Sequence, residues 1–242
     1  KMDWWIGLLG SATISGIAYW KKSLTAGGGL AAVIVGTIVF ALGSPAWYGS
    51  LIAFFISSTL WARWRQEEKR GAEQRYAKTA NRDAGQVFAN GGAALLACML
   101  HSWIPHPAVW MFFLGSLAAV NADTWATELG SLSRSEPRLI LGGRKVARGT
   151  SGAVSWAGIA ASAAGGLFIA LVALALGGHT LGSPAEAASS SSIGSVSISM
   201  LIIGTAAGLF GSLADSLIGA SCQVLYRCPS CGLNVESAAH CG

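Results

Sequence analysis

The sequence predicts an all-α fold, a polytopic transmembrane helix bundle of about seven spans. Of the 242 residues, 52% are hydrophobic and only 11% are charged, whereas soluble domains carry about 25% charged residues. The apolar residues gather in runs whose length suits a membrane crossing, and the charged residues fall between these runs. The runs cover residues 4–20, 29–43, 46–62, 85–104, 107–124, 153–177 and 196–220.

The connections between the runs complete the predicted layout. The second and third runs are separated only by a turn at Ser44–Pro45. Residues 63–83 are polar and predict a helical extension followed by a loop, and residues 131–148 predict a second polar loop. Residues 179–194 are rich in Ser and Ala and predict a loop at the opposite end of the bundle.

The basic residues predict the orientation of the bundle. All of the 16 Lys and Arg residues except Lys1 lie in connections that a seven-span count puts on one side. Because basic loops remain in the cytoplasm, we expect the N-terminus outside and the C-terminus inside. The net charge of +5 then reflects topology and affinity for anionic head groups or phosphates, and no nucleic-acid partner is expected. The tryptophans lie near the predicted ends of the runs and are interpreted as interfacial anchors.

Two acidic residues stand inside apolar runs. Asp123 and Asp215 are each preceded by Ala and followed by a hydroxyl residue. A carboxylate in a bilayer costs roughly 2.5–3.5 kcal/mol on insertion scales, so it marks a functional site by default. The predicted topology puts both acids near the cytoplasmic ends of two spans that run in the same direction. A divalent cation would make two such carboxylates tolerable. The structural alternatives are a helix end for Asp123 and a polar helix contact for Asp215.

Further polar residues surround both acids. In the fifth run, Asp123 and Thr127 share one helix face, and Asn121 and Glu128 share another. Oxygen ligands of this kind suit Mg²⁺, which also binds substrate phosphates; the alternative role of Glu128 is to end the helix at the interface. In the seventh run, small and polar residues at three- and four-residue spacing form a stripe. This stripe consists of Ser212, Asp215, Ser216 and Gly219, and Gln223 follows it.

A Gly/Ser/Thr turn opens the sixth run directly after basic residues. A helix start offers free N–H groups, and together with hydroxyls and nearby cations it suits a bound phosphate. The alternative is a helix N-cap formed by Thr150 or Ser151. The motif comprises Lys145, Arg148, Gly149, Thr150, Ser151 and Ser155.

Gln86 and Asn90 lie four residues apart at the start of the fourth run, just after Arg82. They could orient a ligand or link helices, and the sequence favours neither. His101 and His106 lie at the outer end of the bundle, where the fourth run ends and the fifth begins. No histidine base is therefore expected near the two acids, which lie near the cytoplasmic end.

The tail at residues 221–242 follows the expected transmembrane domain at residues 1–220. A C-x-x-C pair followed by His and Cys has zinc-ligand spacing and lies on the reducing, cytoplasmic side, so it predicts a structural Zn²⁺. Cys222 is an alternative ligand, and a disulfide is the less expected alternative to the metal. The predicted ligands are Cys228, Cys231, His240 and Cys241.

In this combination and order, the motifs resemble the integral membrane family that contains transmembrane protein 19 and the plant phytyl-phosphate kinase. The resemblance runs from about residue 25 to the end of the chain. It implies a relationship to dolichol and phytol kinases, and a more distant one to CDP-diacylglycerol synthases. The segments that carry it are Gln86–Gly92, Ala122–Gly130, Gly149–Ser155, Gly211–Ser216 and Cys228–Cys241.

The resemblance implies a CTP-dependent lipid kinase that phosphorylates a prenyl monophosphate of phytyl, geranylgeranyl or farnesyl type at the cytoplasmic face. Such an acceptor is already ionised near neutral pH, so no strong base is needed. We expect Asp123 and Asp215 to hold Mg²⁺, with Glu128 as a further ligand or a support. The expected phosphate- and substrate-binding residues are Arg82, Gln86, Asn90, Thr124, Thr127, Lys145, Arg148, Gly149, Thr150, Ser151, Ser155, Ser212, Ser216 and Gln223.

Three other functions stay open on the sequence. A cytidylyltransferase would join CMP to a lipid phosphate and release pyrophosphate. A cation-coupled transporter would use the two acids to bind Na⁺ or protons, although transporter sites usually lie near the membrane midplane and these polar residues gather in one leaflet. The third is a non-catalytic membrane protein. The sequence makes no prediction about oligomeric state.

Overall fold

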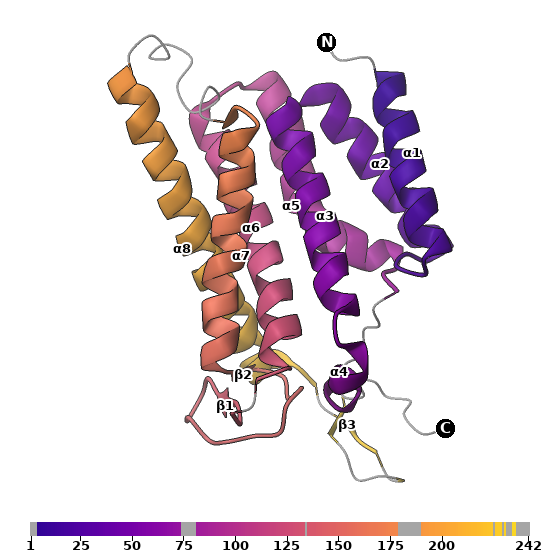
Figure 1. The fold of residues 1–242 in the computed structure, drawn as a ribbon, viewed down its shortest axis with the longest axis vertical. Helices are drawn as coiled ribbons and strands as arrows, with labels where there is room; N and C mark the ends of the chain where they lie inside the picture. The colour runs from indigo at the N-terminus through magenta and orange to yellow at the C-terminus, as the bar shows by residue number, and fades with distance from the viewer. Residues whose placement is uncertain are drawn as a thin grey trace.

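The computed structural model describes residues 4–73, 81–133, 135–178, 190–224, 226–228, 230 and 234–235. Over these residues the chain is mostly helical, and its long helices form one bundle (Figure 1). The helices are α1 (Trp4–Trp20), α2 (Ala26–Leu42), α3 (Pro45–Arg63), α4 (Gln66–Glu73), α5 (Ala84–Trp103), α6 (Pro107–Gly130), α7 (Trp156–Ala175) and α8 (Ser190–Cys222). Short antiparallel strands pair β1 (Arg138–Leu139) with β2 (Ala153–Val154) and β3 (Tyr226–Arg227) with β4 (Asn234–Val235).

Each of the seven apolar runs overlaps one long helix, namely α1, α2, α3, α5, α6, α7 or α8. By length and composition alone, two described stretches could span a membrane, Trp156–Ala175 and Gly194–Cys222, and Ala26–Leu42 is a shorter apolar helix. Large apolar side chains face outward from the bundle, including Leu96 at 66% and Phe210 at 69% exposure. Exposed apolar surface of this extent indicates contact with lipid. The number of crossings stays a prediction.

The prediction of a helical fold is confirmed in that the described chain is mostly helical, and two short antiparallel strand pairs add to the helices. The alternative role of Thr150 or Ser151 as the helix N-cap is wrong, because α7 begins at Trp156 and its N-cap is Ser155, whose Oγ accepts from the amide of Gly158 at 3.1 Å. The reason is the pairing of β1 with β2, which keeps residues 153–154 extended immediately before the helix.

A cluster of aromatic side chains forms part of the core. Trp47 and Trp110 are only 1% and 0% exposed, so the prediction that they are interfacial anchors is wrong. The Trp47 ring lies 5.0 Å from that of Trp110 and 4.3 Å from that of Phe113. Trp103 and Trp156, in contrast, are 87% and 83% exposed, as anchors should be.

Glycines let α7 and α8 approach closely. A Cβ on Gly166 would lie 2.4 Å from the carbonyl oxygen of Gly204, and one on Gly208 would lie 2.8 Å from the Cα of Gly166. Small residues commonly allow such contact between membrane helices. Substitution by any larger residue would therefore push these two helices apart.

α6 and α8 meet in a regular parallel register. A Cβ on Gly115 would lie 3.5 Å from that of Ala207, and one turn further on, a Cβ on Gly211 would lie 2.5 Å from that of Ala119. Each helix then advances by one more turn to the aspartate predicted as a metal ligand. The helix packing thus aligns two acids that are far apart in the sequence.

Candidate active site

One large cavity, with a volume of about 640 Å³, lies at the end of the bundle that carries β1 and β2. Its walls come mainly from α3, α4, α5, α6, α7 and α8, from Arg82 and from residues 148–155. Nearly all of the residues predicted from the sequence line it. These are Arg82, Gln86, Asn90, Asp123, Thr124, Thr127, Glu128, Arg148, Gly149, Thr150, Ser151, Ser155, Ser212, Asp215, Ser216 and Gln223.

The two aspartates lie on adjacent helices in the cavity wall. Asp123 on α6 is half-buried, and Asp215 on α8 is exposed to the cavity. Ser212, one turn before Asp215, donates from its Oγ to Oδ1 of Asp123 at 3.3 Å. This hydrogen bond ties α6 to α8 at the level of the two acids.

The oxygen donors around these acids fit a Mg²⁺ ion that substrate would complete. The hydroxyls of Thr124, Ser212 and Ser216 line the cavity beside the carboxylates of Asp123 and Asp215. Mg²⁺ usually binds one or two carboxylates and fills its other positions with water and substrate phosphate. Within the described residues, no group of three His, Cys, Asp or Glu side chains could hold a metal ion by itself. The donor set therefore suits a metal that arrives with a phosphate.

Glu128, predicted as a further ligand, is paired with a lysine. Nζ of Lys69 lies 2.6 Å from Oε2 of Glu128 and also donates to the carbonyl of Trp61. Lys69 belongs to α4, and its side chain is 1% exposed. This contact holds α4 against the end of α6, and it makes Glu128 a member of a charge pair at the cavity wall.

Arg82 is fixed in place by its backbone. Its carbonyl accepts from the amide of Thr25 at 2.9 Å, and its amide donates to the carbonyl of Ser23 at 3.0 Å. Burial lowers the pKa of the Arg82 guanidinium, and the charge of Glu128 opposes that lowering. Arg82 is thus a partly buried cation in the cavity wall, and its guanidinium suits an anionic ligand. Gln86 and Asn90, in the first two turns of the following helix α5, also line the cavity.

The turn after Arg148 depends on glycine. Gly149 and Gly152 have φ values of +78° and +73°, which favour glycine. A Cβ on Gly152 would lie 2.4 Å from that of Ala220, so α8 packs directly on the turn. Ser151 donates from its Oγ to Oε1 of Gln223 at 2.5 Å. The end of α8 therefore supports a turn whose residues Gly149, Thr150 and Ser151 line the cavity.

Two residues singled out in the sequence lie elsewhere. Lys145, predicted to bind phosphate, does not line the cavity, and its Nζ lies 3.1 Å from Oε2 of Glu136 at the surface. Asn121 is fully buried and links three helices, since its Nδ2 donates to the carbonyl of Gly165 at 2.8 Å and its Oδ1 accepts from Ser57 at 3.0 Å. Asn121 therefore has a packing role.

Most of the predicted zinc ligands lie outside the described residues. Cys228 is described and is 4% exposed. Cys231, His240 and Cys241 are not among the described residues. The zinc site stays a prediction.

Comparison with known proteins identifies the family. Residues 9–241 match the family described as integral membrane protein DUF92. The chain belongs to this family. It is 33% identical to Protein PGR of Arabidopsis thaliana over 233 residues, which covers 90% of this chain and 78% of that protein. The membrane family expected from the sequence motifs is thereby confirmed.

Two microbial relatives are similar at comparable identity. An uncharacterized membrane protein of Methanocaldococcus jannaschii is 32% identical over 170 residues, covering 70% of this chain and 62% of the relative. An uncharacterized membrane protein of Synechocystis sp. is 30% identical over 209 residues, covering 84% of this chain and 73% of the relative. No solved structure matches the DUF92 chain.

The cavity of this DUF92 protein also includes residues that the sequence reasoning missed. Lys69 stands in a run of charged residues, and nothing in that run distinguishes it from its neighbours. Ser162 could have been found, because Ser155, Gly158 and Ser162 repeat the three- and four-residue spacing that identified the stripe on α8. The other missed polar residues in the wall are Gln66 and Ser131.

Proposed function

We propose that this protein is a membrane-embedded prenyl phosphate kinase, which transfers a phosphoryl group from CTP or another nucleoside triphosphate to a prenyl monophosphate. The observation that carries the proposal is one cavity that combines two aspartates, a partly buried arginine and a glycine-hydroxyl turn. Phosphoryl transfer depends mainly on positioning and on neutralisation of charge. Membership of an integral membrane family supports a lipid acceptor.

In the proposed reaction, an oxygen of the acceptor phosphate forms a bond to the γ-phosphorus of CTP. The bond from that phosphorus to its bridging oxygen breaks, and the products are a prenyl diphosphate and CDP. Arg148 and the amides of Gly149 and Ser151 would bind the nucleotide phosphates, and Arg82 would bind the acceptor phosphate. Asp123 and Asp215 would hold Mg²⁺, which when bound neutralises charge on the phosphoryl oxygens.

The test is transfer by purified protein in the presence of Mg²⁺, γ-labelled CTP and phytyl, geranylgeranyl or farnesyl phosphate. We expect labelled prenyl diphosphate together with CDP. Asp123→Asn and Asp215→Asn should each lower kcat/KM by about 100-fold or more, because each removes a charge needed to hold the metal. Glu136→Gln is a matched control at an exposed carboxylate outside the cavity and should change kcat/KM by less than about twofold. Absence of transfer to all three lipids, or unchanged transfer in both aspartate variants, would contradict the proposal.

The same cavity would also suit a cytidylyltransferase, since an acid pair beside a phosphate-binding turn serves either reaction. α-Labelled CTP separates the two. A kinase leaves that label in CDP, whereas a cytidylyltransferase moves it to the lipid and releases pyrophosphate.

A further inference from the structure

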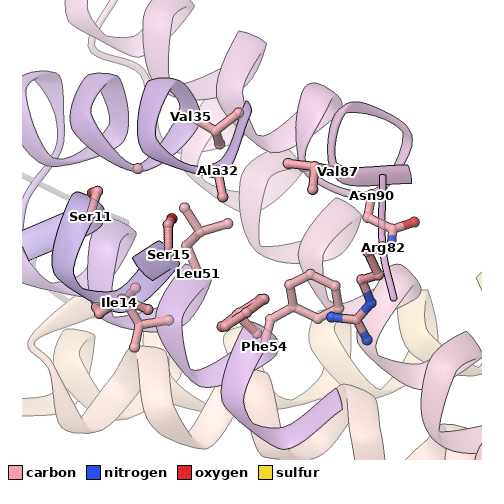
Figure 2. Close-up of a pocket in the computed structure, with 14 residues that line it drawn as sticks. Ser11, Ile14, Ser15, Ala32, Val35, Leu51, Phe54, Arg82, Val87 and Asn90 are labelled. Atoms are coloured by element: carbon pink, nitrogen blue, oxygen red, sulfur yellow. The ribbon is translucent and has the colours of Figure 1, made fainter. Parts of the chain in front are cut away.

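A second cavity, of about 70 Å³, lies between α1, α2, α3 and α5 (Figure 2). Most of its wall is apolar, and the side chains that form the apolar part include Ile14, Val35, Leu51, Phe54 and Val87. Figure 2 shows Arg82 and Asn90 at one end of this cavity and Ser11 and Ile14 toward the other, with apolar side chains between them.

The two cavities share part of their walls. Arg82 and Asn90 line both the large polar cavity and the small apolar one. The Arg82 guanidinium also lies over the Phe55 ring, 5.9 Å from its centroid. A cation and an amide thus mark the boundary between a polar space and an apolar space.

This arrangement matches the chemistry of an amphiphile with an anionic head. Arg82 is partly buried where the two cavities meet, and a phosphate oxygen accepts charge-assisted hydrogen bonds from a guanidinium. An apolar chain that leaves the phosphate would be stabilised by burial, by about 0.8 kcal/mol for each CH₂ group. Asn90 adds an amide that can donate a hydrogen bond to the same head group.

We propose that the small cavity binds the head-proximal part of the prenyl chain of the acceptor, with its phosphate held by Arg82 and Asn90. This inference rests on the proposed kinase function and names the acceptor half of its site. The cavity has about half the volume of the roughly 150 Å³ engineered cavity that accepts benzene. It therefore takes no more than the first isoprene unit. The rest of the chain would run outward past α1, which lies beside α2 at the edge of the bundle (Figure 1).

Adjacent glycines on α5 provide a matched pair of variants. A Cβ on Gly91 would contact Val35 at an ordinary 3.6 Å, so a larger side chain there fits at its base and fills the apolar cavity. A Cβ on Gly92 would meet nothing within 4 Å. We expect Gly91→Leu to raise KM for geranylgeranyl phosphate by about tenfold and to leave KM for CTP within about twofold. Gly92→Leu should leave both KM values within about twofold.

A second measurement uses the unaltered protein and does not require turnover. A geranylgeranyl phosphate with a diazirine on its first isoprene unit is photolysed on the protein, and the labelled residues are mapped. We expect label on α1, α2 or α3 at Ile14, Val35, Leu51 or Phe54, and we expect Arg82→Ala to reduce it at least about fivefold. Unlabelled geranylgeranyl phosphate should compete, whereas geranylgeraniol and bulk phospholipid should not.

The outcomes separate the two proposals. An active enzyme in which Gly91→Leu changes neither KM overturns the cavity assignment alone, as does label confined to other helices or competition by phospholipid. If Gly91→Leu does not fold, the photolabelling decides. If the unaltered protein transfers no phosphoryl group to any prenyl phosphate, the kinase proposal fails, and head-dependent labelling would still identify a prenyl phosphate site.

Discussion

Lys69 is a charged side chain with only 1% of its surface exposed, and its partners explain why the fold tolerates it. Its Nζ donates to Glu128 at 2.6 Å and to the carbonyl of Trp61. Glu128 is 21% exposed, so water screens the pair only in part. A buried pair of this kind adds little net stability over an apolar replacement, but loss of one partner leaves a charge uncompensated. Here the pair also fixes α4 beside the cavity.

We therefore predict that Lys69→Met and Glu128→Gln are each destabilising, and that their effects are not additive. Glu128→Gln should lose about 3 kcal/mol of unfolding free energy, because Lys69 is 1% exposed and would keep an uncompensated charge. Lys69→Met should lose less, because Glu128 is 21% exposed and also interacts with the charge of Arg82. The double variant should lose clearly less than the sum of the two losses. The test is to measure the unfolding free energy of the unaltered protein, the two single variants and the double variant in detergent. A double variant that loses the full sum would show that the two charges are not coupled.

Close packing of small residues is the feature at the scale of helices that builds the site. Gly211 on α8 packs against Ala119 on α6, and Gly208 packs against Gly166 on α7. Both contacts lie within two turns of Asp215, and the contact of Gly211 with Ala119 sets the separation between α8 and α6, the helices that carry the two acids. The geometry of the acid pair therefore depends on residues that do not line the cavity.

Gly208→Leu should reduce both stability and activity. A Cβ at this position would lie 2.8 Å from the Cα of Gly166, so the new side chain must force α7 and α8 apart, at a cost of about 3 kcal/mol. Gly194→Leu is the control on the same helix, because a Cβ there would meet nothing within 4 Å. It should retain activity and the unfolding midpoint. Equal behaviour of the two variants in thermal unfolding and transfer assays would contradict this account.

The helices could be predicted from the sequence because hydropathy and helix length are local properties. The gathering of the predicted site residues at one end of the bundle could be predicted from the order of the spans and from the rule that basic loops remain in the cytoplasm. The pairing of Ala153–Val154 with β1 could not be predicted, since it depends on how the connection folds back. Lys69 was missed for the same reason, because its partner lies 59 residues away. Trp47 lies near a helix end, where an anchor is expected, and only packing against Trp110 shows that it faces inward.

Along the whole molecule, polar and apolar surfaces are separated by position on the bundle axis. α4, β1, β2 and β3 lie at the end opposite the start of α1 (Figure 1). The large cavity opens at this same end, and Arg148 lies in its wall. The sides of the bundle expose apolar residues such as Ile202 at 62%. A lipid acceptor could thus remain in the bilayer while its phosphate meets a nucleotide at the polar end.

The orientation of this axis is the prediction that belongs to the whole molecule. Basic connections resist transfer across the membrane, so the end that carries β1 should face the cytoplasm. In a variant whose five cysteines are replaced, Ser135→Cys and Ser102→Cys place single thiols at exposed positions near β1 and near the end of α5. A membrane-impermeant maleimide should label the Ser102→Cys protein in intact cells. It should label the Ser135→Cys protein only after permeabilisation, because that thiol lies near β1, at the end expected to face the cytoplasm. The reverse pattern would put the cavity outside the cell, away from cytoplasmic CTP. Labelling of both thiols from one side would contradict an odd number of membrane crossings between residues 102 and 135.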